Sequence, residues 1–195
     1  MTKTEEQRLI RLAAAGDRAA AEAMIKAHQR SLYAYLLRLS GRSDLAEDVT
    51  QEAFVRVLTN LDRFDPRFRF STWVFTIARR LFLNFCEKKR AIPAGDASGA
   101  WASGAARSET LVERAEDTLV ARDVLQKGLM SLTFEQREVI ILFHQQEWPI
   151  WLISDHLGMP EGTVKSHLHR GRKRLRESLD SIKLVGSESL QEALI

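Results

Sequence analysis

The sequence predicts an all-α protein in which two small helical domains are joined by a flexible linker. Apolar residues recur at helical spacing along most of the chain, and no segment has the alternation of a half-buried strand. Residues 92–109 break this periodicity and are rich in small residues, which is typical of a linker. The predicted divisions are therefore a first domain at 1–91, the linker at 92–109, a second domain at 110–180 and a tail at 181–195.

The first two helices of the first domain are marked by their ends. One is expected over residues 5–15, before the breaking pair Gly16-Asp17, and the next extends to about Leu39. Gly41 follows the second helix, and glycine readily takes the left-handed conformation that ends a helix.

The third and fourth helices carry the residues that suggest a function for this domain. Ser43 or Asp44 is expected to cap the third helix, with Glu47 three residues after Asp44, as in a capping box. A break at 65–66 separates this helix from the fourth, which is expected over 71–89. One apolar stripe is expected to pack the fourth helix, and it consists of Trp73, Ile77, Leu81 and Phe85.

Helical periodicity returns after the linker. A first helix is expected over residues 111–129. Thr133 and Gln136 then have the spacing of a second capping box, which predicts the start of a helix over 134–145. Two further helices follow, so the second domain is expected to hold four.

The segment 163–176 is the most informative part of the chain. It contains six Lys or Arg and no acid, while apolar residues at helical spacing leave one face able to pack. Upstream, a short helical pattern at 149–157 is ended by Gly158, and Pro160 suits the first position of a new helix. This order of helix, short turn and basic helix is the outline of a helix-turn-helix that reads DNA. An ordinary solvated helix face is the alternative.

Aromatic rings and cations are interleaved between residues 63 and 90. Seven of the fifteen aromatic residues lie between Phe64 and Phe85, and eight Lys or Arg stand in this region against two acids. Single-stranded nucleic acid is bound by such a combination, because cations neutralise phosphates while rings stack on unpaired bases. The alternatives are burial of the rings in the core, above all of Phe75 and Phe82, and plain solvation of the cations.

The third helix carries an acidic stripe opposite its apolar side. Asp44, Asp48, Gln51 and Glu52 lie on this side, and carboxylates four residues apart repel one another. A basic protein partner would remove the repulsion, and simple solvation is the alternative. The segregation of acids on this helix from cations at 63–90 indicates separate surfaces for a basic and an anionic partner.

Several classes of function find no support in the sequence. It contains no phosphate-binding loop, no metal-spaced cluster of His and Cys and no nucleophile–base arrangement, so no catalytic residue, cofactor or metal is predicted. The single cysteine, Cys86, excludes an internal disulfide. No apolar run approaches a membrane span and the N-terminus lacks a signal-peptide core, so a soluble, cytoplasmic protein is expected.

Three ordered segments flank the linker: DLAEDVTQEAFVRVLTNLDRFD, FSTWVFTIARRLFLNFCEKKR and LTFEQREVIILFHQQEWPIWLISDHLGMPEGTVKSHLHRGRKRL. Together they resemble bacterial RNA polymerase sigma factors, and more narrowly the extracytoplasmic-function (ECF) group. The resemblance covers residues 5–178 and implies two helical domains, called region 2 and region 4. It also implies a protein without catalysis that binds core RNA polymerase and directs promoter-specific transcription initiation.

The resemblance implies a role for residues in each segment. In the third helix, six residues match the face that docks on the clamp coiled coil of the largest polymerase subunit: Asp44, Glu47, Asp48, Gln51, Glu52 and Phe54. The next segment matches the part that melts and reads the −10 promoter element as a single strand: Phe68, Arg69, Phe70, Trp73, Arg79, Arg80, Asn84 and Lys88. The basic helix matches the reader of the −35 element in duplex DNA: Thr163, Lys165, Ser166, His167, His169, Arg170, Lys173 and Arg174.

Some features depart from the family pattern or extend beyond it. Positions 80 and 84 are usually Asn and Asp but are Arg80 and Asn84 here, so the −10 base preference does not follow from the resemblance. Trp148 and Trp151 are expected to be packing residues, or otherwise a hydrophobic patch for a regulator. The tail at 181–195 is expected to be frayed or loosely packed.

The partners implied by the resemblance are core RNA polymerase and promoter DNA, both as duplex and as single strand. An anti-sigma factor that occludes one or both domains is the expected regulator, and no membrane insertion is expected. The alternative function is a helix-turn-helix repressor or activator that acts without core polymerase. Such a protein would need no aromatic-rich melting segment.

Overall fold

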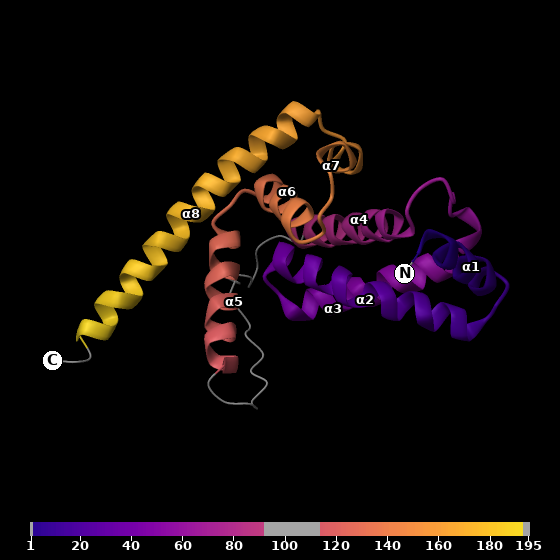
Figure 1. Ribbon diagram of the computed structural model, residues 1–195, viewed down its shortest axis with the longest axis horizontal. Helices are drawn as coiled ribbons and strands as arrows, with labels where there is room; N and C mark the ends of the chain where they lie inside the picture. Colours follow the sequence, from indigo (N-terminus) through magenta and orange to yellow (C-terminus); the bar gives the residue numbers. More distant parts are fainter. Residues whose placement is uncertain (1, 92–113, 193–195) are drawn as a thin grey trace. The chain divides into compact units, whose positions relative to one another are not determined.

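The computed structural model describes residues 2–91 and 114–192, and the chain divides into two compact units, Met1–Gly104 and Ala105–Ile195 (Figure 1). Every regular element in the described residues is a helix, which confirms the predicted all-α class and its two helical domains. The predicted linker at 92–109 lies outside the described residues. None of the described helices is long and apolar enough to cross a membrane.

The first unit is built around α2, which contacts α1, α3 and α4. Its elements follow one another in the predicted order: α1 (Lys3–Ala14), α2 (Arg18–Ser40), α3 (Ser43–Thr59), the short 3-10 helix η1 (Leu61–Arg63) and α4 (Phe70–Ala91). The Asp17 side chain accepts a hydrogen bond from the Ala20 amide at the start of α2, and Gly41 ends α2 in the left-handed conformation with φ of 70°. These two residues separate the helices where the sequence predicted.

The core of the first unit shows that the stripe predicted to pack α4 was wrong. The buried residues of α4 are Phe70, Val74, Phe75, Ala78 and Phe82, whereas Trp73, Ile77, Leu81 and Phe85 are only half-buried. Phe75 lies against Tyr35 of α2, with 5.0 Å between ring centroids. Burial in the core, the alternative considered for Phe75 and Phe82, is therefore the correct interpretation of both rings.

The start of α3 also differs from the prediction. The helix begins at Ser43, so Arg42 is the N-cap residue and no side chain caps the helix. Asp44 lies within the first turn, where the Arg42 guanidinium holds its carboxylate. The predicted capping box between Asp44 and Glu47 is therefore absent, although an acid in the first turn still stabilises the helix dipole.

The second unit contains α5 (Arg114–Met130), α6 (Phe134–His144), α7 (Ile150–Leu157) and α8 (Glu161–Glu192). The predicted capping box opens α6, because the Thr133 side chain accepts from the Gln136 amide and the Gln136 side chain accepts from the Thr133 amide. Gly158 ends α7 with φ of 66°, and α8 follows after two residues. The helix-turn-helix formed by α7 and α8 is therefore present where the sequence predicted it.

The long helix α8 packs on α5, α6 and α7, and a glycine lies at its contact with α6 and at its contact with α5. Gly171 of α8 is buried, and a Cβ atom there would lie 2.7 Å from Ile140 Cδ1 of α6. Gly128 of α5 similarly faces Leu175, whose Cδ1 would lie 2.8 Å from a Cβ atom. These glycines let α8 approach both neighbouring helices closely. The helical backbone continues to Glu192, so it includes most of the tail that was predicted to be frayed.

A buried arginine fastens α5 to α6. Arg137 is only 7% exposed, and its guanidinium donates to the carbonyl oxygens of Leu129 (Nε, 2.9 Å), Met130 (Nη2, 3.3 Å) and Leu132 (Nη2, 3.1 Å). These carbonyls lie at the end of α5 and in the turn that follows, where helix geometry leaves acceptors without intrahelical partners. Burial lowers the pKa of Arg137, and the three acceptors offset the cost of burying its charge.

Candidate nucleic-acid interface

The first part of α8 presents a basic surface. Seven of the eight residues predicted to read the −35 element are exposed there, namely Thr163, Lys165, Ser166, His169, Arg170, Lys173 and Arg174. The eighth, His167, is half-buried, and its Nδ1 atom is buried without a hydrogen-bond partner. Val164 and Leu168 are buried on the opposite side, so packing of the apolar face turns the cations outward.

The structure separates this basic surface into two flanks. Lys165, His169 and Lys173 line a shallow groove together with Phe143 of α6 and Ile150 of α7. Four others recur at intervals of three or four residues outside that groove, and they are Thr163, His167, Arg170 and Arg174. When α8 lies in a DNA groove, only one of these two flanks can face the base edges. Base contacts are therefore expected from one flank and phosphate contacts from the other.

The ion pairs on α8 leave its cations available. Lys165 Nζ lies 3.7 Å from Glu161, and Lys173 Nζ lies 4.0 Å from Glu177. All four side chains are more than half exposed, and exposed pairs at these distances contribute little stability. A phosphate can therefore displace either carboxylate at small cost.

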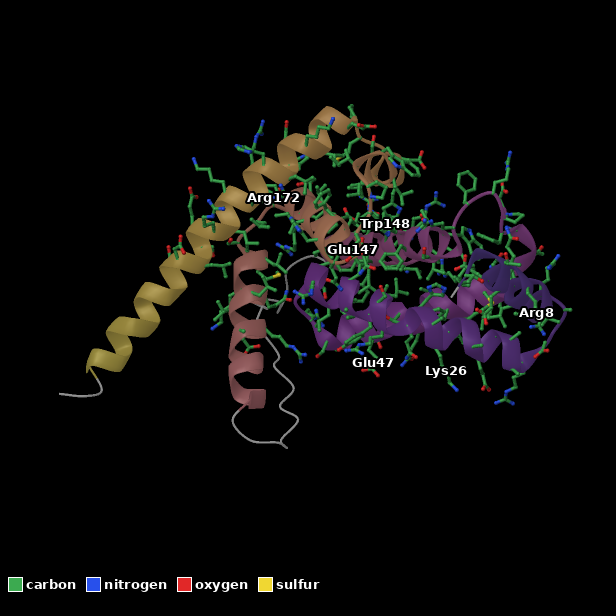
Figure 2. All side chains as sticks on the ribbon, viewed as in Figure 1. Arg8, Lys26, Glu47, Glu147, Trp148 and Arg172 are labelled. Carbon is green, nitrogen blue, oxygen red and sulfur yellow. The ribbon has the colours of Figure 1, made fainter. Side chains whose placement is uncertain are left out.

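One basic residue of α8 serves the fold instead. Arg172 projects toward α6 (Figure 2), where its Nε donates to His144 Nε2 at 3.1 Å and its guanidinium lies 5.1 Å from the centre of the Phe143 ring. Burial and the neighbouring Arg172 charge lower the pKa of His144, and a neutral imidazole is the form that accepts this hydrogen bond. The periodicity of the basic run gives no sign of this role.

In the first unit, the turn before α4 presents one exposed ring. Phe68 is 58% exposed and stands between the exposed cations Arg67 and Arg69. Phe70, by contrast, is fully buried, with its ring centroid 5.5 Å from Phe64 and 5.9 Å from Trp73. Phe70 therefore cannot contact DNA directly, although the resemblance implied such a contact. It supports the turn by packing against Phe64 and Trp73.

The C-terminal half of α4 combines cations with an amide. Arg80, Asn84 and Lys88 are exposed and Arg79 is half-buried. Asn84 and Lys88 also line a groove between α3 and α4 whose other wall includes Asp48 and Glu52. The structure thus places predicted DNA-binding and polymerase-binding residues around the same groove, which the sequence did not predict.

The outer face of α3 carries the acidic stripe. Five of the six residues implied to bind polymerase are exposed, namely Asp44, Glu47, Asp48, Gln51 and Glu52. Phe54 is buried at 6% exposure, so it packs α3 and offers no surface to a partner. Val55, which the sequence did not single out, is 55% exposed and extends the stripe with an apolar side chain.

Two arginines modulate the charge of this face. The Arg42 guanidinium lowers the pKa of Asp44 to about 2, chiefly by donating a hydrogen bond to its carboxylate. Arg56 Nε donates to Glu52 at 2.8 Å. Asp44 therefore stays ionised at any physiological pH, and the Arg42 charge also interacts with the carboxylate of Asp48.

Comparison with known proteins identifies the family. Residues 24–92 match the family described as Sigma-70 region 2, and residues 122–175 match Sigma-70 region 4. The chain is 33% identical over 170 residues to the ECF RNA polymerase sigma factor SigW of Bacillus subtilis, which covers 84% of this chain and 91% of that protein. The chain belongs to the ECF RNA polymerase sigma factors. It directs promoter recognition by RNA polymerase and is not itself an enzyme.

Other relatives agree with this assignment. The sigma factor is 32% identical over 168 residues to the ECF sigma factor EcfG of Rhodopseudomonas palustris, covering 85% of this chain and 89% of that one. The crystal structure of the sigma factor RpoE in complex with the anti-sigma factor NepR from Bartonella quintana matches with a TM-score of 0.68 at 26% identity, covering 82% of this chain and 96% of that chain. CnrH, in complex with the cytosolic domain of CnrY, shares the fold with a TM-score of 0.67 at 22% identity, covering 91% and 98%.

The two family matches leave some helices of the sigma factor wholly or partly uncovered. Region 2 begins at residue 24, inside α2, and continues through α4, so α1 lies outside it. Region 4 ends at residue 175, whereas α8 continues to Glu192. Both exposed surfaces of α3 and α4, and the basic part of α8, lie inside the matched regions.

Proposed function

We propose that this sigma factor uses three surfaces during initiation, of which the two on the first unit adjoin at the groove between α3 and α4. The acidic face of α3 docks on the clamp coiled coil of the largest polymerase subunit, through Asp44, Glu47, Asp48, Gln51 and Glu52. The turn before α4 and the exposed side of α4 bind the −10 element as a single strand. The start of α8 binds the −35 element in the major groove. No cofactor takes part, and the protein acts in the cytoplasm, where polymerase and promoter DNA lie.

The observation that carries this proposal is the outward orientation of opposite charges on neighbouring helices. Acids face outward from α3, while an exposed ring and cations face outward from the turn and from α4. A basic partner and an anionic partner can therefore bind the first unit at the same time. Phe54 and Phe70 are excluded from the contact surfaces because both are buried; they hold the helices that carry those surfaces.

The −10 surface fits a melted strand better than a duplex. Stacking of an unpaired base on an exposed ring is worth about 1–3 kcal/mol, which offsets part of the cost of unstacking. Phe68 is the most exposed ring of this surface, and Trp73 is half-buried against Phe64 and Phe70. Arg69, Arg79, Arg80 and Lys88 supply charge for phosphates, and Asn84 supplies a donor and an acceptor for a base edge.

The −35 surface fits duplex DNA. Arg170 and Arg174 lie on the outer flank of α8, and arginine holds guanine through two parallel hydrogen bonds. The remaining cations neutralise phosphates. Three Lys or Arg of the run are then left for phosphates, namely Lys165, Lys173 and Arg176, and about three phosphate contacts give a slope of log affinity against log salt of about −3.

We also propose that an anti-sigma factor regulates this protein by occluding one or both of its helical domains. Two proteins with the same fold form complexes of this kind. RpoE of Bartonella quintana binds the anti-sigma factor NepR, and CnrH binds the cytosolic domain of CnrY. Trp151 is 62% exposed on α7, which corrects its prediction as a packing residue, while Trp148 is buried as predicted. An exposed tryptophan of this kind is a typical anchor for a protein partner.

The surfaces can be tested separately with purified core polymerase. Asp48→Ala is expected to weaken binding to core polymerase, while Arg170→Ala weakens binding of the holoenzyme to a −35 duplex by about 1–3 kcal/mol and relaxes the preference for guanine at one position. Glu5→Gln, an exposed acid on α1, serves as the control for the first variant and Arg18→Ala, an exposed arginine on α2, for the second. Loss of polymerase binding with Arg170→Ala, or loss of −35 binding with Asp48→Ala at polymerase concentrations that saturate this variant, would contradict the assignment.

A further inference from the structure

The turn that presents Phe68 is built to a defined geometry. The Phe68 amide donates to the Asp65 carbonyl at 3.1 Å, with Pro66 at the second position of the turn. The Arg67 amide donates to Asp65 Oδ1 at 2.9 Å, and the Arg67 side chain also binds the Asp65 carboxylate. Asp and Pro at these positions are the residues that favour such a turn. Hydrogen bonds within a turn fix its shape but do not fix its place on the unit.

One anchor of the turn comes from the residues after it. Phe70 is fully buried and Phe64 is half-buried, and these rings pack against each other and against Trp73. The ring centroids of Phe64 and Trp73 are 5.3 Å apart. Such edge-to-face and tilted pairs are each worth about 0.5–1.5 kcal/mol beyond burial. This cluster holds both ends of the turn.

The second anchor is α1. This helix contacts η1, directly before the turn, and lies beside the segment between α3 and α4 (Figure 1). Gln7 Nε2 donates to the Pro66 carbonyl at 3.5 Å, which ties α1 to the turn itself. Nothing in the sequence suggested that these segments, far apart along the chain, would meet.

A histidine on α2 connects α1 to the aromatic cluster. The His28 ring lies 5.3 Å from the Phe70 ring, and His28 Nε2 lies 3.5 Å from Glu6 Oε1 without making a hydrogen bond. The side chains of His28 and Glu6 are only 14% and 17% exposed. His28 therefore packs close to both Glu6 of α1 and Phe70 of α4, and this packing connects α1 to the aromatic cluster.

We propose that α1 is a positioning element for strand opening, in which Glu6, Gln7 and His28 hold the turn so that Phe68 meets the melted strand. This inference rests on the −10 function proposed for the turn. Glu6, Gln7 and His28 do not touch DNA, and they act through Pro66 and Phe70. The family match begins at residue 24 and therefore gives α1 no role.

The test uses holoenzyme on promoter DNA, with the rate of opening followed by permanganate reactivity of the −10 thymines. Glu6→Gln and Gln7→Ala are each expected to slow opening about fivefold, the lower end of the coupling between two sites. Core polymerase affinity and affinity for a −35 duplex are expected to stay within about twofold of the unaltered protein. Glu5→Gln, which changes an exposed acid on the same helix, is the control and should open promoters normally.

A double-mutant cycle with Phe68→Ala separates positioning from a general loss of stability. If α1 acts through Phe68, Gln7→Ala adds nothing to the defect of Phe68→Ala, so the two effects are far from additive. Additive effects, a parallel loss of polymerase affinity, or normal opening in both α1 variants would overturn the inference. Normal opening with Phe68→Ala would instead remove the proposed function of the turn, and the inference with it.

Discussion

Gly171→Ala tests how closely α8 must approach α6. The new Cβ atom would lie 2.7 Å from Ile140 Cδ1 and 3.4 Å from Ile140 Cγ1, whereas carbon atoms prefer about 3.5–4.0 Å. Ile140 is 5% exposed, so its side chain has little room to turn away. Overpacking of this kind costs about 1–3 kcal/mol, and the better helix propensity of alanine returns about 1 kcal/mol. We expect a net loss of about 1 kcal/mol in the free energy of unfolding of the second unit.

The assay is urea unfolding of the whole chain followed by the indole NMR signal of Trp148, which is buried in the second unit (Figure 2). Gly162→Ala is the matched control, because a Cβ atom there meets nothing within 4 Å. This control is expected to be neutral or to gain up to about 1 kcal/mol.

Ile140→Val removes the one atom that would clash most severely. Alone it is expected to cost about 0.5–1.5 kcal/mol. In combination with Gly171→Ala the clash with Cδ1 is gone, so the double variant should be about 1 kcal/mol more stable than the sum of the single effects. Strict additivity, or a Gly171→Ala variant more stable than the unaltered protein, would refute the reasoning.

Three other outcomes follow from the described contacts. Phe68→Ala should change the stability of the first unit by no more than about 0.5 kcal/mol but weaken binding of a −10 single strand at least fivefold. Phe70→Ala should instead cost about 3–5 kcal/mol of stability. Equal stability losses of the two variants in urea unfolding would be inconsistent with the exposure of Phe68 and the burial of Phe70. Arg137→Met leaves three carbonyls without their donor and should cost about 3 kcal/mol of stability in urea unfolding. A loss under about 1 kcal/mol would show that other contacts hold α5 to α6. The pKa of His144 is lowered from its ordinary value of 6.5, so the folded state binds fewer protons than the unfolded state and the second unit should lose stability as pH falls below about 6.5. NMR titration of His144 measures this pKa directly, and His144→Gln should flatten the pH dependence.

Local signals were predicted well. The capping box of Thr133 and Gln136 involves only four consecutive residues, so their spacing was enough to locate the start of α6. Gly41 and Gly158 both adopt positive φ where a helix had to stop. The second predicted capping box failed for an equally local reason, because α3 begins at Ser43 and Asp44 therefore lies inside its first turn.

The packing of α4 could not be predicted because apolar residues occupy too many of its positions. Two stripes of helical spacing are available, one through Trp73 and Ile77 and one through Phe70 and Val74. Contacts with α3 and α2, including that between Phe75 and Tyr35, decide which stripe is buried. This choice removed Phe70 from the predicted DNA surface and left Phe68 exposed.

Residues that support the fold through distant contacts carried no sequence signal at all. Arg137 has the appearance of a surface cation in an amphipathic helix, yet the carbonyls at the end of α5 hold it inside. Arg172 cannot be distinguished in the sequence from the other cations of α8, and only its contact with His144 sets it apart. In both cases the partner lies on another helix.

The central claim is that this chain gives core polymerase its promoter specificity. Run-off transcription on fragmented genomic DNA, with purified core polymerase in the presence and absence of the protein, measures this most directly. The account predicts new transcripts with shared upstream elements only when the protein is present, and their loss with Asp48→Ala or Arg170→Ala. Binding to duplex DNA without any new transcription start would contradict it and would favour a repressor that acts without polymerase.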